Sequence, residues 1–367
     1  MNRVVEGSSE REVMNPPVIV KLDARNLDMA RLREVVNSCR ENKMVVFPTE
    51  TVYGIGGRMT APEIEARLCE IKGRPNEKPF AYHIGDWEML ETLQVQVTPA
   101  FRYMAVHYWP GPVTLLARNR AGQKIGLRFP KNRIACALIN EVGEPFVASS
   151  ANKSGQGSPH TAQQATEALE GFFDTVIDGG RTEFASDSTI VDLAEAVPGV
   201  LRKGAQGAEF EKAVEKLKAG KFPRKRILMV CTGNSCRSPM AEGWLRHELD
   251  KRGLSPQIEV ASCGVAAREG LPASPEAEFV LRNREVDISR HQSRVCRKCD
   301  VWGADLIFAM GPQHAAEMAR TLASAKEKTI VLDVPDPIGM GMSVYETTLN
   351  EIERKLKPHL GVITELS

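Results

Sequence analysis

The chain has 367 residues, of which 42% are hydrophobic and 26% charged, and its formal net charge is +1 at pH 7. This length exceeds the usual size of a single hydrophobic core, so we expect two domains. The near-neutral charge excludes a chain-wide attraction to nucleic acid or to a membrane surface, and no apolar run approaches the roughly 18 to 20 residues of a membrane span.

The N-terminal segment MNRVVEGSSEREVMNPP is polar and lacks the apolar stretch of a secretory signal. We predict a flexible tail over residues 1–17 and a cytoplasmic protein. The eight cysteines are too sparse for a disulfide framework, so we expect free thiols. Cys296 and Cys299 form a C-x-x-C pair, but no second pair of ligands follows at zinc spacing, so no metal site is predicted.

From Val18 onward, short apolar runs alternate with helical periodicities. The run IVKL is followed by a predicted helix from Asp28 to Glu41 and by the predicted strand MVVF at residues 44–47. As far as LRKGA at 201–205, strands and helices alternate without a strict repeat, and turns are rich in glycine and proline. This pattern predicts an α+β domain with a twisted mixed sheet over residues 18–207.

Four cations of this domain each lie beside a predicted turn or strand end: Lys72, Arg74, Arg128 and Arg202. Each alone is typical of a solvated turn, but together they could line one concave site for a triphosphate or a carboxylate. The segment contains no Walker loop, and its GIGG lacks the spacing of a dinucleotide-binding fingerprint.

Several segments in order, among them FPTETVYGIGG, KGRPNEKPFAYHI and ASSANKSG, resemble the YrdC family, the L-threonylcarbamoyladenylate synthases that begin the threonylcarbamoyl modification of tRNA. The K-x-R and S-x-N pairs of that family match Lys72/Arg74 and Ser150/Asn152. In two places the sequence departs from the family. Lys78 stands where asparagine is frequent, and FAYHI replaces a more aliphatic strand before His83.

The resemblance implies that the substrates are ATP, L-threonine and bicarbonate, that Mg²⁺ accompanies the ATP phosphates, and that no organic cofactor is tightly bound. It also points to tRNA or tRNA-modification proteins as partners. By the same resemblance, ATP would be held by Lys72, Arg74, Lys78, Asn152 and Arg202, and threonine by Thr51, His83, Arg128, Ser150 and Ser188.

Residues 208–226, AEFEKAVEKLKAGKFPRKR, are predicted to form a charged amphipathic helix followed by a basic stretch that contains proline. This composition is typical of a linker between domains. We interpret FPRKR as a solvated tether rather than as a contact to RNA.

Beyond the linker, the pattern changes to strand, loop and helix in repetition. It predicts an α/β, doubly wound parallel sheet over residues 227–367. The expected strands cover 227–230, 258–262, 305–310 and 329–334, and the expected helices cover 239–252, 275–284 and a final stretch from Val344.

The segment CTGNSCRSP at 231–239 joins the first of these strands to its helix. Consecutive backbone N–H groups and the helix dipole would then form an anion cradle, which makes Thr232, Gly233, Asn234, Ser235 and Cys236 a candidate phosphate loop. The same field would favour the thiolate of Cys231 as a nucleophile.

Three more residues complete a phosphatase mechanism. Arg237 would grip two phosphoryl oxygens, Ser238 would hydrogen-bond the thiolate, and Asp336 in VPDPIG would protonate the leaving group and then activate water. The expected course is attack by sulfur, a phosphocysteine intermediate and its hydrolysis.

This combination resembles the low-molecular-weight protein tyrosine phosphatases over residues 225 to about 360. Ser235 and the pair Ile338–Gly339 resemble the protein arginine phosphatase branch more closely, although that branch usually has threonine at the position of Ser235. A phosphoprotein is the expected substrate, and phosphoarginine and phosphotyrosine both stay open. Arsenate reductases share the fold, but Cys296 and Cys299 precede the predicted strand 305–310, whereas that family has a cysteine at its end.

The sequence therefore predicts a bifunctional enzyme. The alternative is a double-stranded RNA-binding module of YrdC type without synthesis, fused to a phosphatase-like domain that only binds anions. Retention of Lys72, Arg74, Cys231, Arg237 and Asp336 favours the enzyme.

Overall fold

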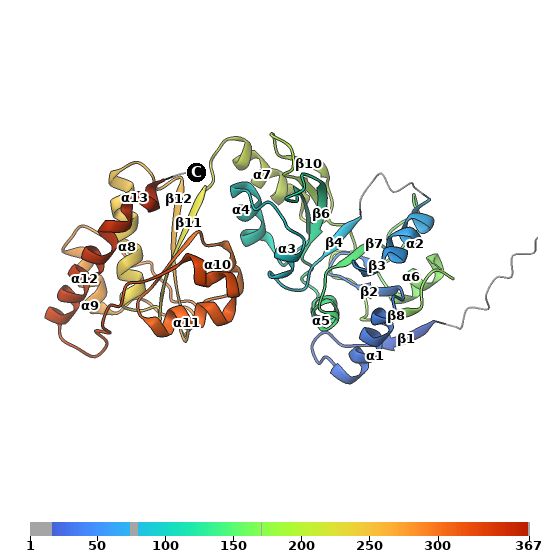
Figure 1. Ribbon diagram of the computed structural model, residues 1–367, viewed down its shortest axis with the longest axis horizontal. Coiled ribbons are helices and arrows are strands. Elements are labelled where there is room, and N and C mark those ends of the chain that lie inside the picture. The colour runs from blue at the N-terminus through green and yellow to red at the C-terminus, as the bar shows by residue number, and fades with distance from the viewer. Residues whose placement is uncertain (1–16, 74–79, 170, 366–367) are drawn as a thin grey trace, which may run out of the picture.

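The computed structural model describes residues 17–73, 80–169 and 171–365. A ten-stranded and a four-stranded sheet form the centres of two successive domains (Figure 1). This arrangement confirms the predicted α+β domain followed by an α/β domain. In the part of the chain that is described, no helix combines the length and the apolar character needed to cross a bilayer. The tail predicted for residues 1–17 lies outside the described residues except for Pro17.

The N-terminal sheet is mixed, with the strand order β1-β8-β2-β3-β7-β4-β6-β5-β9-β10. Strand β4 pairs in parallel with β6 and antiparallel with β7, so strand ends from distant parts of the chain meet. The strands are β1 Val18–Lys21, β2 Val45–Pro48, β3 Tyr53–Arg58, β4 Ala81–His83, β5 Val113–Arg118, β6 Lys124–Arg128, β7 Phe146–Ser150, β8 Thr175–Asp178, β9 Thr189–Asp192 and β10 Gly199–Arg202.

Helices α1, α4, α5 and α6 of this domain begin where a short polar side chain caps them. The Asp28 carboxylate accepts hydrogen bonds from the first turn of α1, and Asn132 does the same for α5. Thr98 caps α4, whose first residue is Pro99. The helices are α1 Met29–Arg40, α2 Pro62–Lys72, α3 Met89–Thr92, α4 Pro99–Tyr108, α5 Arg133–Val142, α6 Ala162–Ala168 and α7 Gly207–Lys218.

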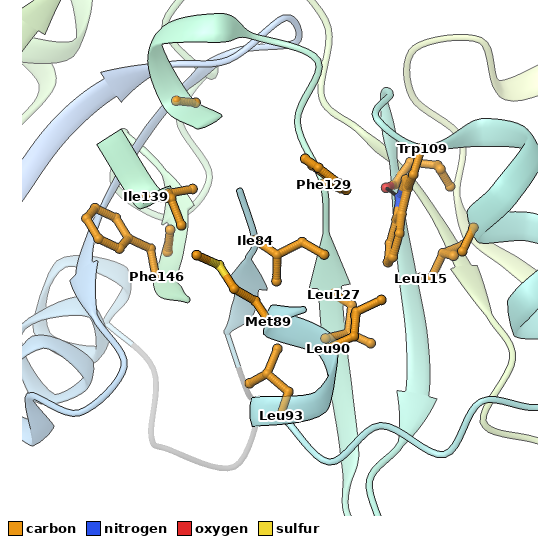
Figure 2. Close-up of a cluster of buried hydrophobic side chains, with 14 of the residues drawn as sticks. Ile84, Met89, Leu90, Leu93, Trp109, Leu115, Leu127, Phe129, Ile139 and Phe146 are labelled. Atoms are coloured by element: carbon orange, nitrogen blue, oxygen red, sulfur yellow. Dashed lines mark hydrogen bonds between the residues drawn. The ribbon is translucent and has the colours of Figure 1, made fainter. Parts of the chain in front are cut away.

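A buried apolar cluster lies beneath the segment that links β4 to α3 (Figure 2). Ile84 follows β4 directly and is fully buried, and it lies between Met89 of α3 and Phe129 at the end of β6. The backbone N–H of Ile84 donates to the carbonyl of Arg128 at 2.8 Å. The ends of β4 and β6 are therefore held together by both packing and hydrogen bonding.

Helix α7 contains the first part of the segment predicted as a linker. Its buried residues Phe210, Ala213, Val214 and Leu217 belong to the core of the N-terminal domain. Residues 219–224 alone join this helix to the first strand of the second sheet.

The C-terminal sheet is entirely parallel, in the order β12-β11-β13-β14. One face packs against α8, α9 and α12 and the other against α10, α11 and η1, which is the predicted doubly wound arrangement. Its elements are β11 Lys225–Cys231, α8 Arg237–Lys251, β12 Ile258–Gly264, α9 Pro275–Arg282, α10 Lys298–Gly303, β13 Leu306–Ala309, α11 Pro312–Thr321, η1 Ala323–Lys328, β14 Thr329–Val331, α12 Met342–Leu356, η2 Lys357–His359 and α13 Leu360–Thr364.

Candidate active sites

A cavity of about 240 Å³ opens over the N-terminal sheet. Ends of β4, β6 and β7 and the loop before β9 contribute its walls. The structure thus brings together six side chains that lie far apart in the sequence. Those predicted site residues that line the cavity are Thr51, His83, Arg128, Ser150, Ser188 and Arg202.

Two further predicted residues meet at the edge of this cavity. Lys72, in the last turn of α2, points its Nζ at the carbonyl of Ser150 at 2.8 Å and at both oxygens of Asn152, at 2.6 and 2.9 Å. Lys72 is buried, so these oxygens hold its ammonium group in one place. Arg74 and Lys78 lie outside the described residues.

Arg128 is the buried cation of the cavity. Its guanidinium donates from Nη2 to Glu50 Oε1 at 2.6 Å and to Thr51 Oγ1 at 3.2 Å. Its Nε is buried and has no hydrogen-bond partner in the described part of the chain. The residue therefore lines the cavity with a buried guanidinium that is only partly paired.

Glu50 is a residue that sequence reasoning missed. Its side chain and that of Arg128 are each only 3% exposed, and its second oxygen accepts the backbone N–H of Lys131 at 3.0 Å. The pair fixes the guanidinium against the loop between β2 and β3. The sequence pattern that could have identified Glu50 is a single acidic residue between two threonines, directly after an apolar strand.

His83 reaches the cavity as a neutral side chain. Burial and the nearby Arg128 cation lower the pKa of His83 to about 3. Its ring meets the ring of Phe47 edge-on at 6.0 Å. An uncharged imidazole can hydrogen-bond or pack against a ligand, but it carries no positive charge at neutral pH.

Another part of the cavity wall is built from Ser188 and its partners. Arg202 Nη2 donates to the carbonyl of Ser188 at 2.9 Å and to its hydroxyl at 3.1 Å. The same hydroxyl lies 2.9 Å from Thr114 Oγ1, and Asp187 forms an ion pair with Arg202 at 3.7 Å. Arg202 is therefore held at the mouth with part of its guanidinium free to meet a phosphate.

The second site lies where β11 ends and α8 begins. Cys231 is 3% exposed, and its sulfur accepts the backbone N–H of Asn234 at 3.2 Å and lies 3.0 Å from Ser238 Oγ. Because Ser238 Oγ itself accepts from Asn234 Nδ2, its own proton can be donated to the sulfur. The sulfur thus faces its loop, as the sequence predicted.

Asn234 holds the loop in its turned conformation. It is fully buried and has a φ of 55°, a left-handed value that asparagine tolerates. Its Nδ2 donates to Ser262 Oγ at 2.8 Å and its Oδ1 accepts the backbone N–H of Arg294 at 2.9 Å. His291 Nε2 donates to its carbonyl at 2.7 Å. Sequence reasoning missed Ser262, Arg294 and His291.

Arg237 and Asp336 meet at the mouth of this loop. Arg237 is 4% exposed, donates from Nη1 to the carbonyl of Val334 at 3.1 Å, and forms an ion pair with Asp336 through Nη2. The Asp336 side chain is 41% exposed. A buried guanidinium and an accessible carboxyl group therefore flank the entrance together, as the spacing predicted.

His314, in the first turn of α11, also touches the loop. Its Nε2 lies 2.9 Å from Thr232 Oγ1, and it is fully buried. Burial and Arg237 lower the pKa of His314, although Asp336 opposes the shift. The sequence did not identify this residue.

The other cysteines contribute no ligand cluster. Cys236 Sγ lies 3.3 Å from the Tyr345 hydroxyl, and Cys296 Sγ lies 3.6 Å from Met318 Sδ. Within the described ranges, no group of three or more His, Cys, Asp or Glu side chains is placed to hold a metal ion.

Two family models match the chain. The Sua5/YciO/YrdC model, described as telomere recombination, matches residues 37–204, and the low molecular weight phosphotyrosine protein phosphatase model matches residues 226–366.

Some known relatives match most of the chain and others match one domain. The threonylcarbamoyl-AMP synthase of Pyrococcus abyssi is 35% identical over 314 residues, which cover 77% of this chain and 89% of that protein. A protein-arginine-phosphatase of Geobacillus stearothermophilus is 35% identical over 137 residues, 35% of this chain and 88% of that protein. The crystal structure of P. abyssi Sua5 complexed with L-threonine is 25% identical, covers 86% of this chain and 99% of that chain, and has a TM-score of 0.50.

Proposed function

Because the chain belongs to the Sua5/YrdC family of threonylcarbamoyl-AMP synthases and carries a domain of the low-molecular-weight phosphatase family, we propose that it is a bifunctional enzyme. Its first activity forms L-threonylcarbamoyladenylate from L-threonine, bicarbonate and ATP, for the threonylcarbamoyl modification of tRNA. The observation that carries this proposal is the cavity that gathers the buried Arg128 with Ser188 and Arg202.

The reaction needs no covalent attachment to the protein. The threonine amine captures CO₂ derived from bicarbonate, a carbamate oxygen attacks the α-phosphorus of ATP, and pyrophosphate leaves. Arg128 would bind the threonine carboxylate through its free donor. Lys72, held by Ser150 and Asn152, and Arg202 would meet the phosphates. Holding the two reactants in line supplies most of the catalysis.

Mg²⁺ would enter with ATP. In the described part of the chain no acidic cluster is placed to hold a metal by itself, and Asp187 is the acidic side chain of the cavity. The ion would therefore be bound chiefly by the phosphates, where it neutralises their charge.

The test is pyrophosphate release from ATP by the full chain, with threonine and bicarbonate each withheld in turn. Arg128→Ala should abolish threonine-dependent pyrophosphate release, because the substrate carboxylate loses its buried partner. Arg31→Ala, an exposed arginine of α1, is the matched control and should keep full activity. Pyrophosphate release that ignores threonine would contradict the proposal.

The second activity that we propose is hydrolysis of a protein phosphoester or phosphoramidate through Cys231. The thiolate attacks phosphorus, the bond to the leaving group breaks, and Asp336 gives that group its proton. Water then attacks the phosphocysteine, Asp336 takes the proton, and phosphate is released. Ser238 and the Asn234 amide, which already contact the sulfur, would stabilise it when it leaves.

The ion pair between Arg237 and Asp336 fits this sequence of events. A bound phosphoryl group offers Arg237 two oxygens and would replace the carboxylate there. Asp336 would then be free to reach the leaving group. The Cys231→Ser variant should lose turnover by at least about 10³-fold, whereas Cys296→Ser, a thiol outside the loop, should retain it. Turnover that survives Cys231→Ser would exclude the covalent route.

Phosphoarginine is the substrate that we favour over phosphotyrosine. The arginine phosphatase relative covers this whole domain, and the small Ser235 and the Ile338–Gly339 pair leave the loop without an aromatic slot. Side-by-side turnover of phosphoarginine and phosphotyrosine peptides by the full chain tests the preference, and faster turnover of phosphotyrosine would refute it.

The remaining predictions concern partners and place. A tRNA or a tRNA-modification protein would receive the adenylate, and the cytoplasm is the proposed compartment. The alternative, an RNA-binding module without synthesis, is not favoured, because the relatives that match this domain are named as synthases.

A further inference from the structure

Helix α10 of the phosphatase-type domain packs directly on the other domain, beside α3 and α4 (Figure 1). The ring of Trp302 on α10 lies 4.8 Å from the ring of Trp87 and 6.3 Å from that of Phe101. At Gly303 the two backbones are so close that a Cβ atom would lie 2.4 Å from Val106 Cγ2. The contact is therefore tightly fitted at its apolar centre.

Charged pairs surround this apolar centre. Lys298 Nζ donates to both carboxylate oxygens of Asp86 at 2.8 Å and lies 3.5 Å from Glu88. On the other side, Arg102 of α4 forms an ion pair with Asp305, whose carboxylate also accepts the backbone N–H of Arg226 at 2.8 Å. An apolar centre with a polar rim is the usual organisation of a specific protein interface.

The partners on the N-terminal side lead straight to the proposed threonine pocket. Asp86 and Trp87 follow His83 of β4 by three and four residues. The ring of Trp87 also meets that of Phe129 edge-on at 5.6 Å, and Phe129 directly follows Arg128. Trp302 therefore packs on Trp87, which follows His83 by four residues and whose ring contacts Phe129, the residue after Arg128.

We propose that α10 is a positioning element of the threonine pocket, supplied by the phosphatase-type domain. Lys298 and Trp302 act through Asp86 and Trp87 and hold the ends of β4 and β6 in register. On this view the two domains are joined because the second domain holds the walls of the threonine pocket of the first domain in place. The kinetic part of this inference rests on the synthase activity proposed above, whereas its structural part does not.

Hydrogen exchange of the full chain tests the structural part. In Trp302→Ala, amides of residues 83–90 and 127–130 should exchange faster, while β1 and β8, remote from α10 in the sheet order, should exchange as before. Trp302→Phe retains an aromatic ring and should restore protection. Ile352→Val, a core change on α12 away from the interface, controls for general loosening of the phosphatase-type domain. Unchanged exchange in both segments of Trp302→Ala would overturn the proposal.

Kinetics then separate positioning from simple loss of folded protein. Trp302→Ala should raise the KM for threonine about tenfold, because a small displacement of a binding group is enough, while the KM for ATP and the phosphatase turnover stay unchanged. A lower kcat with an unaltered threonine KM would indicate only loss of folded enzyme and would count against the proposal. If the wild-type chain makes no adenylate, the proposed synthase function fails, and the exchange measurement still decides the role of α10.

The ion pair offers an independent check. Lys298→Asp and Asp86→Lys should each raise exchange in residues 83–90, and the double swap should restore protection, because the pair is re-formed with reversed charges. If the increases in exchange of the two single variants add up in the double variant, the ion pair does not couple the domains.

Discussion

We expect replacement of Asn234 to show how much this residue stabilises the candidate phosphate loop. This residue makes three side-chain hydrogen bonds, to Ser238 at 2.9 Å, to Ser262 at 2.8 Å and from the Arg294 amide at 2.9 Å. It does so from a left-handed backbone conformation with a φ of 55°. Replacement by alanine, glycine or aspartate changes the hydrogen bonds and the backbone preference in different combinations. The three variants therefore separate the side-chain contribution to stability from the backbone contribution.

The magnitudes follow from the contacts. Each lost hydrogen bond costs about 1 kcal/mol, and alanine adds roughly 1 to 2 kcal/mol because it disfavours a left-handed conformation. Asn234→Ala should therefore lower the stability of this domain by about 4 kcal/mol. Asn234→Gly avoids the backbone cost and should lose about 3 kcal/mol. Asn234→Asp keeps the acceptor for Arg294 but places a carboxylate at a fully buried position, so it should lose more stability than either neutral variant.

Urea-dependent hydrogen exchange of peptides from β11 gives the stability of this domain separately from that of its neighbour. Phosphatase turnover measures the effect of each variant on the loop. We expect Asn234→Ala to reduce kcat about 10²-fold, which is the size of effect typical when one aligned hydrogen-bond donor is removed from an active site. The predicted order of stability is wild type, Gly, Ala, Asp. If glycine were no more stable than alanine, the backbone argument would be refuted, and if aspartate were as stable as the wild type, the side-chain argument would be.

Three other predictions concern titratable groups. The pKa of His83 is lowered from 6.5 to about 3, so its neutral form contributes stability above pH 6.5 that is lost at about 1.4 kcal/mol per pH unit as the pH falls toward 3. The urea concentration at the midpoint of unfolding should therefore fall less steeply with decreasing pH in His83→Gln than in the wild type. Equal slopes would contradict the lowered pKa of His83. Glu50→Gln should cost about 3 kcal/mol in urea unfolding and raise the threonine KM, because it leaves Arg128 buried without its counter-charge; an unchanged KM would argue against Arg128 as the carboxylate partner. Asp336→Asn should slow phosphatase turnover about 10²-fold or more and remove one limb of its pH–rate profile, and a wild-type profile would exclude Asp336 as the acid.

The phosphate loop could be predicted from the sequence because its chemistry is local. Cys231, Asn234, Ser238 and Arg237 lie within eight consecutive positions between a strand and a helix, so the geometry of that junction alone brings them together. Asp336 could be added because the carboxyl ends of parallel strands share one edge. Ser262, which anchors Asn234 from a neighbouring strand, carried no such local signal.

The N-terminal cavity was predictable by resemblance rather than by spacing. The six predicted site residues that line it come from segments between Thr51 and Arg202, and no helical or strand periodicity relates them. Glu50 was missed because an acid becomes a buried counter-ion only when a distant strand delivers Arg128 beside it. Likewise, the amphipathic pattern of α7 indicated a helix but not that Phe210 and Leu217 would complete the first core.

By itself the sequence determined the two fold classes, the candidate nucleophile and its loop, and the candidate substrate-binding side chains. Such features depend on residues close together along the chain or on recognisable ordered motifs. Tertiary structure decided which buried charges are paired, which turn is clamped by Asn234, and that α10 of one domain presses on Trp87 of the other. The physical reason is that burial and charge pairing depend on contacts between residues distant in sequence, such as Asp86 and Lys298, and these exist only once the chain has folded.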